Sequence, residues 1–308
     1  MQFMHQTSNA HLGMPKKYLR YFKITDLTIQ IETDFPTNSH TFHRKFNLFE
    51  ISASGQADVC IRHHFFLPDG YGAGFDRELY HKIPWVIYRK SKTWIYQRIS
   101  PLRNAPDRVK QVAVFNSDYT LADIYHRTDE EFLKGSLESL SLLTTDQIFL
   151  SHVLSNRDSC YLHACGVNFD GKGLLFAGDS GSGKSTIAAM LTESAQLLCD
   201  ESIIVKKQSS GFRMFGTWSH GDLPEVSSGS APLKAVLFLE KSQKNTLIPI
   251  KSKKEKTRHL LRCLVKPFIS THWWENTLSL IEKLADEIPC YILQFNKDRA
   301  LIEMLRKV

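Results

Sequence analysis

A glycine-rich segment in the second half of the chain constrains the fold more than any other feature. The apolar run 173–177 before it predicts a strand, and the run 186–191 after it predicts a helix. A strand, a tight loop and a helix in this order predict an α/β core. The segment fits the pattern G-x-x-x-x-G-K-[ST] without a mismatch, through Gly178, Asp179, Ser180, Gly181, Ser182, Gly183, Lys184 and Ser185, with Thr186 next.

The same residue types suit the binding of a phosphate anion. Glycines let successive backbone N–H groups turn towards one anion, and the start of the following helix adds partial positive charge. Lys184 is spaced to reach the β- and γ-phosphates, and the Ser185 hydroxyl suits Mg²⁺. We therefore expect residues 178–186 to bind ATP together with Mg²⁺.

Two adjacent carboxylates follow the next apolar run. The run Leu197, Leu198, Cys199 ends in Asp200 and Glu201. At the end of a strand in a nucleotide-binding core, one carboxylate can hold Mg²⁺ and the other can accept the proton of an attacking hydroxyl. We expect Asp200 to be catalytic and Ser185, Asp200 and Glu201 to hold the metal. The alternative is an ordinary solvated strand end.

Two further features lie close to these elements in sequence. His163 stands on the strand pair before the loop, where its imidazole can approach the γ-phosphate or can be an ordinary buried side chain. The polar segment 216–222 lies between two predicted strands, where it either lines an acceptor site or simply connects them. The expected catalytic residues are thus Asp200, His163 and Lys184.

The first half of the chain is rich in strand and turn patterns and contains no phosphate loop. We expect a β-rich accessory region over residues 1–145 and the kinase core over 146–308. In the core, Asp170 and Gly171 form a hairpin turn signal. Strands are predicted in the first half at 21–32, 45–51, 58–66, 85–89, 93–99 and 110–115, and in the core at 160–168, 173–177, 196–205, 233–240 and 289–293. Helices are predicted at 256–265, 271–288 and 297–307.

Composition excludes several classes. A hydrophobic content of 42% indicates a globular core, and a net charge of +7 suits a nucleotide or an acidic partner but not nucleic-acid binding. The six cysteines form no C-x-x-C pair, so we expect reduced thiols. The histidine pairs His40/His43 and His63/His64 lack metal-ligand spacing. No signal peptide is expected in residues 1–6 and no membrane span, which predicts a cytoplasmic protein.

The segment from about Leu150 to Phe295 resembles the HPr kinase/phosphorylase family, whose nucleotide core is shared with phosphoenolpyruvate carboxykinases. By this resemblance His163 matches the active-site histidine, Asp200 matches the aspartate that deprotonates the acceptor serine, and Glu201 replaces a second aspartate. The Gly/Arg/Asn-rich signature associated with phosphorolysis is absent after Leu239, and the N-terminal half is unlike the regulatory domain of that family. The matching residues are 162–164, the loop 178–186, 198–201 and 231–236.

The arrangement is also similar to HPr-kinase-like proteins found beside ribosomal peptide pathways, including kinases of lasso-peptide precursors. The resemblance implies a kinase acting on a serine of a peptide or small protein, and suggests a homo-oligomer. Three alternatives stay open: a kinase of HPr, a kinase of free serine or another small hydroxyl compound, and a non-catalytic nucleotide-binding module. We expect residues 1–145 to select a peptide.

Overall fold

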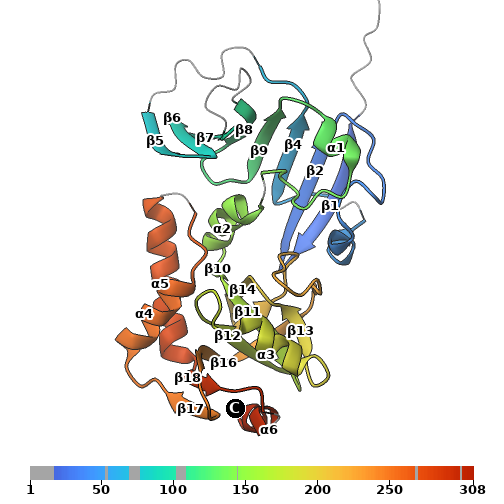
Figure 1. Cartoon of the computed structure of the whole chain (residues 1–308). Coiled ribbons are helices and arrows are strands. Elements are labelled where there is room, and N and C mark those ends of the chain that lie inside the picture. The colour runs from blue at the N-terminus through green and yellow to red at the C-terminus, as the bar shows by residue number, and fades with distance from the viewer. Residues whose placement is uncertain are drawn as a thin grey trace, which may run out of the picture.

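The computed structural model describes residues 17–52, 55–68, 77–101, 109–143, 145–267, 270–298 and 300–308. In this part of the chain two mixed sheets of nine strands each follow one another along the sequence (Figure 1). This agrees with the expected β-rich first half and α/β second half. The expectation about a signal peptide concerns residues 1–6, which lie outside the described residues.

The first sheet has the strand order β3-β1-β2-β4-β9-β8-β7-β6-β5. The β2–β4 and β4–β9 pairs are parallel, and the other pairs are antiparallel. The strands are β1 (Tyr18–Ile24), β2 (Leu27–Thr33), β3 (Glu50–Ile51), β4 (Val59–His64), β5 (Arg77–Lys82), β6 (Trp85–Lys90), β7 (Thr93–Ile99), β8 (Val109–Phe115) and β9 (Leu121–His126).

Two sequence predictions in this half are wrong in detail. The run 21–32 is a hairpin of β1 and β2, because Thr25 adopts a positive φ of 58° and turns the chain. The run 45–51 is mostly the 3₁₀ helix η1 (Arg44–Leu48), and only β3 is extended. The His43 ring caps this helix by accepting the N–H of Lys45, which is a side-chain contact that strand patterning does not reveal.

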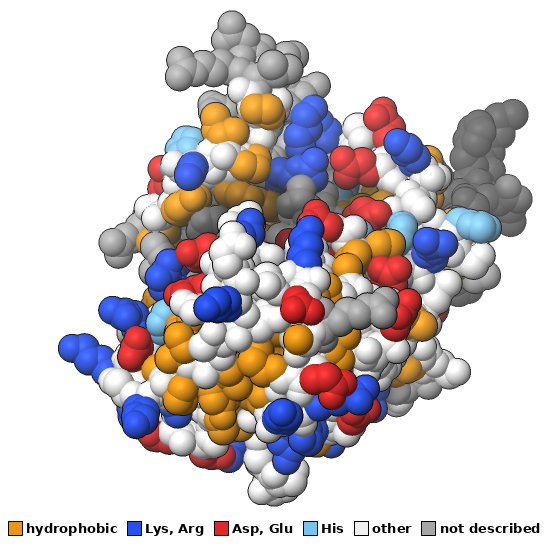
Figure 2. All heavy atoms as spheres, turned by 60° about the horizontal axis from the view of Figure 1, so that its bottom comes forward, with side chains coloured by type: hydrophobic (Ala, Val, Ile, Leu, Met, Phe, Trp, Pro, Cys, Tyr) orange, Lys and Arg blue, Asp and Glu red, His pale blue; other side chains and the backbone are white. Residues whose placement is uncertain are grey.

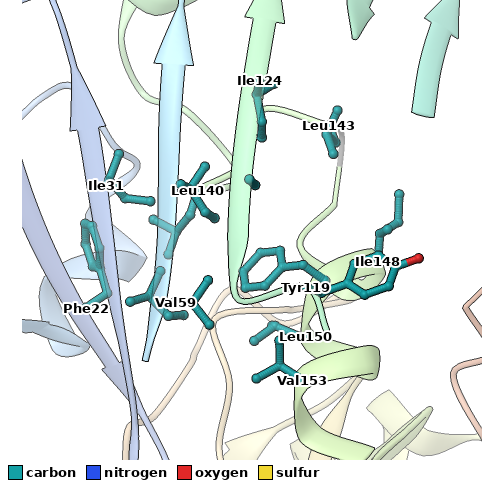
Figure 3. Close-up of a cluster of buried hydrophobic side chains, with 14 of the residues drawn as sticks. Phe22, Ile31, Val59, Tyr119, Ile124, Leu140, Leu143, Ile148, Leu150 and Val153 are labelled. Carbon is teal, nitrogen blue, oxygen red and sulfur yellow. The ribbon is translucent and has the colours of Figure 1, made fainter. Parts of the chain in front are cut away.

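A hydrophobic cluster joins the first sheet to the helix α2 (Gln147–Ser155) (Figure 3). Phe22, Ile31, Val59 and Ile124 come from the strands of the sheet. The helix contributes Ile148, Leu150 and Val153, and the same cluster contains Tyr161, Ile204 and Trp218 from the second half of the chain. The division into 1–145 and 146–308 stays a prediction, and this cluster spans it. The short helix α1 (Glu130–Lys134) lies between β9 and α2 in sequence.

The second sheet follows the order β10-β14-β15-β16-β12-β11-β13, with β18 beside β16 and β17 beside β18. Its β12, β16 and β18 are parallel neighbours. The expected turn at Asp170 and Gly171 is confirmed, with positive φ angles of 53° and 80°. The strands are β10 (Ser159–Leu162), β11 (Ala164–Phe169), β12 (Lys172–Ala177), β13 (Gln196–Cys199), β14 (Ile203–Gln208), β15 (Gly211–Phe215), β16 (Ser230–Lys241), β17 (Thr246–Pro249) and β18 (Cys290–Phe295).

Helices cover both faces of the parallel strands. Alternate residues of β12 explain this, because successive side chains of a strand point to opposite faces. Leu174 and Phe176 belong to a cluster with α3 (Lys184–Leu191) and α6 (Ala300–Arg306). Leu175 and Ala177 belong to another with α4 (Lys253–Cys263) and α5 (Thr271–Glu287). The second half is therefore a mixed α/β layer structure.

The predicted single strand 196–205 is two strands. β13 ends at Cys199 and β14 begins at Ile203, and the two have different partners in the sheet. Asp200, Glu201 and Ser202 form the break between them. An apolar run in sequence does not distinguish one long strand from two short ones, whereas the pairing does.

The charge of the surface is mixed on the face that Figure 2 turns forward. Lys and Arg side chains alternate with Asp and Glu side chains around a patch of hydrophobic side chains (Figure 2). The basic excess of +7 is therefore not gathered into one stripe on this face. Such a stripe is the usual electrostatic footprint of a nucleic-acid-binding protein.

Candidate functional site

The glycine-rich loop, residues 178–183, connects β12 to α3 at the carboxyl end of the parallel strands. Ligands of open α/β sheets bind at this end of the strands. Gly181 and Gly183 have positive φ angles of 76° and 107°, and Gly183 is the residue before the first turn of α3. The chain therefore makes a tight turn over a few residues, and the N-terminus of α3 follows directly after the loop.

The packing around the loop leaves no room for side chains at two of its glycines. A Cβ built on Gly183 would lie 2.7 Å from Cζ of the Phe295 ring in β18. A Cβ on Gly178 would lie 2.5 Å from Oγ of Ser182. Gly183 is thus constrained by its positive φ and by the Phe295 ring, and Gly178 by its contact with the Ser182 side chain.

Lys184 folds back onto the loop. Its Nζ donates to the carbonyl oxygen of Gly178 at 2.9 Å and to that of Asp179 at 3.3 Å. The side chain is buried, and burial lowers the pKa of the ammonium group from its ordinary value. Ser182 Oγ is also buried and has no hydrogen-bond partner among the described residues. An ammonium group held only by carbonyl oxygens fits a phosphate group, which would accept hydrogen bonds from it.

Asp200 lies at the end of β13 and is only 2% exposed. The backbone N–H of Gly221 donates to its Oδ1 at 2.7 Å, and that of Leu223 donates to its Oδ2 at 3.0 Å. A Cβ on Gly221 would lie 3.1 Å from Oδ2. Asp200 thus fastens the segment after β15 against the end of β13. Each oxygen keeps a second lone pair for another ligand.

Glu201 is more accessible than Asp200. Its carboxylate accepts a hydrogen bond from Ser219 Oγ at 3.4 Å, and its backbone N–H points at Cys199 Sγ at 3.4 Å. The two carboxylates lie in the bend between β13 and β14 and have different partners: Asp200 accepts from backbone amides and Glu201 from a serine hydroxyl.

His163 occupies the one-residue break between β10 and β11. Its backbone N–H donates to the carbonyl oxygen of Cys263 at the end of α4, at 2.7 Å. Burial lowers the pKa of its imidazole, and the positive charge of Lys184 lowers it further. The direction of this shift favours the neutral ring, which also interacts with the backbone of Glu201.

A cavity of about 350 Å³ brings most of these residues together. Gly178, Asp179 and Ser182 belong to the loop but do not line this cavity. Sequence reasoning missed Lys241, which ends β16 beside the loop strand; the signal is its place after the predicted strand 233–240. The lining consists of His163, Ser180, Gly181, Gly183, Lys184, Ser185, Thr186, Asp200, Glu201, Gly221, Asp222 and Lys241.

The expected metal ligands Ser185, Asp200 and Glu201 all line this cavity. Within the part of the chain that the structure describes, no group of three or more His, Cys, Asp or Glu residues is arranged to hold a metal ion. Mg²⁺ is commonly bound through one or two carboxylates together with substrate phosphates and water. Two carboxylates and a hydroxyl that line the same cavity fit that mode of binding. The magnesium site itself stays a prediction.

A second cavity, of about 400 Å³, is also lined in part by the segment 216–222. Glu201 lines both cavities, and the segment contributes Ser219 and His220 to the second and Gly221 and Asp222 to the first. The remaining walls of the second cavity come from both halves of the chain: Lys45, Glu138, Thr145, Asp146, Gln147, Tyr161 and Trp218.

The other histidines that stood out in the sequence have structural surroundings. His63 is buried, and its Nδ1 lies 2.9 Å from Nε2 of His126 while its Nε2 lies 2.9 Å from the carbonyl oxygen of Leu140. His64 pairs with Asp123 at 2.9 Å. His43 caps η1. All six cysteines are free thiols, as expected.

The described helices include none with the length and hydrophobicity that crossing a membrane would need. No curated protein sequence matches this chain. A solved structure of the Hpr(Ser) kinase/phosphatase from Coxiella burnetii is similar over 48% of this chain and 86% of its own, at 12% sequence identity and a TM-score of 0.31. This similarity is too low to support a conclusion.

The family model described as SynChlorMet cassette protein ScmC matches residues 130–307. The match begins at α1 and continues through α6, so it contains the glycine-rich loop, the two carboxylates and the segment 216–222 that lines both cavities. Because it takes in more than half of the chain, the protein belongs to the ScmC family of SynChlorMet cassette proteins.

Proposed function

We propose that this protein is an ATP-dependent kinase that transfers the γ-phosphate to a serine hydroxyl of a peptide or small protein. One observation carries the proposal: a single cavity is lined by the glycine-rich loop, Lys184, His163, Asp200 and Glu201. A loop of this kind suits the phosphates of a nucleotide, and neighbouring carboxylates suit the proton and metal chemistry of phosphoryl transfer.

In the proposed reaction the acceptor oxygen forms a bond to the γ-phosphorus while the bond from that phosphorus to the β,γ-bridging oxygen breaks. Asp200 takes the proton of the acceptor hydroxyl, and ADP leaves. Lys184 turns from the carbonyl oxygens of Gly178 and Asp179 to the phosphates, and the neutral imidazole of His163 donates a hydrogen bond to the transferred group. Mg²⁺, when bound by Ser185, Asp200 and Glu201, would neutralise charge on the phosphate oxygens.

The second cavity supports an acceptor route past the segment 216–222, which contributes residues to both cavities. Glu201 belongs to both cavities, so a hydroxyl entering through the second one arrives next to the phosphate site. Lys45 and Glu138 line this cavity and form an ion pair at 2.5 Å. Both come from the first half of the chain, which supports the hypothesis that this half takes part in selecting the acceptor.

The test uses the purified full-length chain with Mg²⁺ and radiolabelled ATP. Three acceptors are compared: free serine, the protein HPr, and a serine-containing precursor peptide encoded near the gene. We expect ATP binding by calorimetry and phosphate incorporation into the peptide by mass spectrometry. Preference for free serine would favour the hypothesis of a small-molecule kinase, and preference for HPr would favour the hypothesis of an HPr kinase.

Two other outcomes contradict the proposal outright. ATP binding with no phosphate transfer to any acceptor or to water would favour a nucleotide-binding module. Absence of ATP binding would remove the assignment of the loop itself.

A further inference from the structure

Arg262 lies beside the glycine-rich loop, although the sequence pattern gives it no role. It belongs to the last turn of α4, and its Nη2 lies 2.8 Å from Oδ2 of Asp179. Asp179 is the second residue of the loop, directly after Gly178. A basic side chain from a distant helix is therefore in direct contact with the proposed phosphate site.

The end of α4 is fixed to the strand that leads into His163. The N–H of His163 donates to the carbonyl oxygen of Cys263 at 2.7 Å, and the N–H of Val265 donates to that of Tyr161 at 2.9 Å. Leu162 and Leu264 form an isolated β-bridge between these two bonds. The backbone next to Arg262 thus has a defined position relative to His163, which lines the cavity.

The side chain of Arg262 is held much less firmly than its backbone. The exposed fraction of the side chain is 60% for Arg262 and 76% for Asp179. Ion pairs this exposed to water contribute little to stability. The guanidinium group can therefore leave Asp179 at low cost when a stronger anionic partner arrives. A phosphate group is such a partner, because it accepts two parallel N–H bonds from arginine.

The charges of the cavity leave a need for one more cation. Lys184 and Lys241 line it together with three carboxylates, those of Asp200, Glu201 and Asp222. The lining by itself therefore has one negative charge in excess, and the proposed Mg²⁺ would change this to one positive charge, which is still fewer than the negative charges of a nucleoside triphosphate. Arg262 is the basic side chain that contacts the loop from outside this lining.

We propose that Arg262 moves from Asp179 to the γ-phosphate and stabilises the charge on the transferred group. The inference rests on the proposed kinase function and adds a catalytic residue to it. Arg262 stays protonated throughout, so it forms and breaks no covalent bond. The chain then supplies from its own helix the arginine that several phosphoryl-transfer enzymes receive from a partner.

The experiment compares Arg262→Ala and Arg262→Lys with the control Arg258→Ala in the full-length protein. Arg258 lies one turn earlier on α4, is exposed, and pairs only loosely with Glu255, at 4.0 Å. The measurements are ATP and ADP affinity by calorimetry, and the rate of ATP consumption with water as the acceptor. Thermal unfolding of each variant checks that the fold is kept.

We expect Arg262→Ala to lower ATP consumption by about 10²-fold or more, since arginines in this role are worth about 10³–10⁵-fold. ADP affinity should stay within about twofold, because ADP lacks the γ-phosphate that Arg262 contacts. Arg262→Lys should recover part of the rate, since it keeps the charge but not the paired N–H bonds. Arg258→Ala should behave like the wild type.

Equal rates for Arg262→Ala and Arg258→Ala would overturn the inference while leaving the kinase proposal intact. An equal loss of ATP and ADP affinity would also overturn it, because the effect would then lie on the loop and not on the γ-phosphate. If Arg262→Ala does not fold, Arg262→Lys decides by the same two criteria. Failure of the wild-type protein to bind ATP would instead remove the proposed function, and this inference with it.

Discussion

The indole N–H of Trp218 donates to Oδ2 of Asp146 at 3.0 Å, which joins the segment 216–222 to the start of α2. The same indole packs against the rings of Phe46 and Phe49, at centroid distances of 5.4 and 5.2 Å. Further along the same segment, the backbone N–H groups of Gly221 and Leu223 donate to the carboxylate of Asp200. One short segment therefore contacts both the first half of the chain and the proposed catalytic carboxylate.

This connection determines how the first half can be tested. Deleting residues 1–145 would remove Phe46 and Phe49 and expose Trp218, Tyr161 and Ile204 of the shared cluster. Loss of activity would then follow from a damaged core as readily as from a lost acceptor site. Point substitutions in the second cavity avoid that ambiguity.

Lys45→Ala is expected to raise the KM for the peptide acceptor while leaving ATP affinity unchanged. Lys45 lines the second cavity, on the far side of Glu201 from the glycine-rich loop. The control is Lys23→Ala, which removes an exposed lysine of β1. Acceptor kinetics and ATP calorimetry on both variants provide the test. An unchanged KM would mean that the acceptor does not enter through this cavity.

Lys184→Ala is expected to remove ATP-dependent phosphate transfer while keeping the fold. The ammonium group supplies a charge to the phosphates, and losing one such donor typically costs about 10²–10³-fold in rate. Its contacts in this structure are two carbonyl oxygens of the loop, so its removal leaves no buried charge unpaired. Turnover within about tenfold of the wild type would show that the loop is not the catalytic phosphate site.

Asp200→Asn and Glu201→Gln are expected to differ. Asparagine loses the proton acceptor, which typically costs about 10²–10⁴-fold in transfer rate. Its NH₂ group would also face a backbone N–H donor, that of Gly221 or Leu223, so we expect a stability loss of about 1–3 kcal/mol. Glu201→Gln removes no such contact and should leave the unfolding temperature unchanged.

Rates, ATP affinities and thermal unfolding of these two variants assign the roles. Parallel loss of ATP affinity and transfer in Asp200→Asn would make Asp200 a metal ligand. A larger rate loss in Glu201→Gln than in Asp200→Asn would make Glu201 the proton acceptor.

Gly183→Ala is expected to lower both stability and ATP affinity. The residue has a φ of 107°, and the added Cβ would lie 2.7 Å from the Phe295 ring. Strained backbone of this kind costs about 1–3 kcal/mol per residue. Gly171→Ala is the matched control, because Gly171 also has a positive φ, 80°, but has nothing within 4 Å of the new Cβ. Equal effects of the two substitutions would show that the Phe295 contact does not matter.

Stability should fall as the pH is lowered from about 6.5 towards 5. Burial lowers the pKa of His63 to about 4 and that of His152 to about 3. Both are neutral in the folded protein in this range, while the unfolded chain takes up protons below pH 6.5, so protons favour unfolding. Each group contributes a slope of up to about 1.4 kcal/mol per pH unit. Denaturant unfolding at pH 7.5, 6 and 5 measures the effect.

The substitution His152→Phe isolates the contribution of His152 to the pH dependence of stability. The imidazole is stacked on the ring of Tyr119, with the two ring centroids 3.8 Å apart. Its Nε2 is buried without a hydrogen-bond partner in the described part of the chain. A phenyl ring keeps the stacking and removes both the titration and the unpaired nitrogen. We expect a shallower pH dependence; an unchanged slope would mean that His152 does not titrate on unfolding.

The sequence by itself determined the features that depend on neighbouring residues. The glycine-rich loop lies between a strand and a helix because glycines allow the positive φ angles that its tight reversal needs. The hairpin turn at Asp170 and Gly171 depends on the same local property. The helix α5 agrees closely with its predicted range 271–288, whereas α4 (Lys253–Cys263) begins three residues before and ends two before the predicted range 256–265, because Ser252 caps its start and Leu264 is extended.

The tertiary structure alone decided which distant residues meet at the site. Asp200 faces the amides of Gly221 and Leu223, and Arg262 meets Asp179, through contacts between segments far apart in sequence. Strand pairing likewise split the run 196–205 and left the two carboxylates in the break. Local propensity acts over a few residues, whereas these partners are chosen by the order of strands in the sheet and by burial of the helices on its faces. No pattern in a single sequence encodes that choice directly.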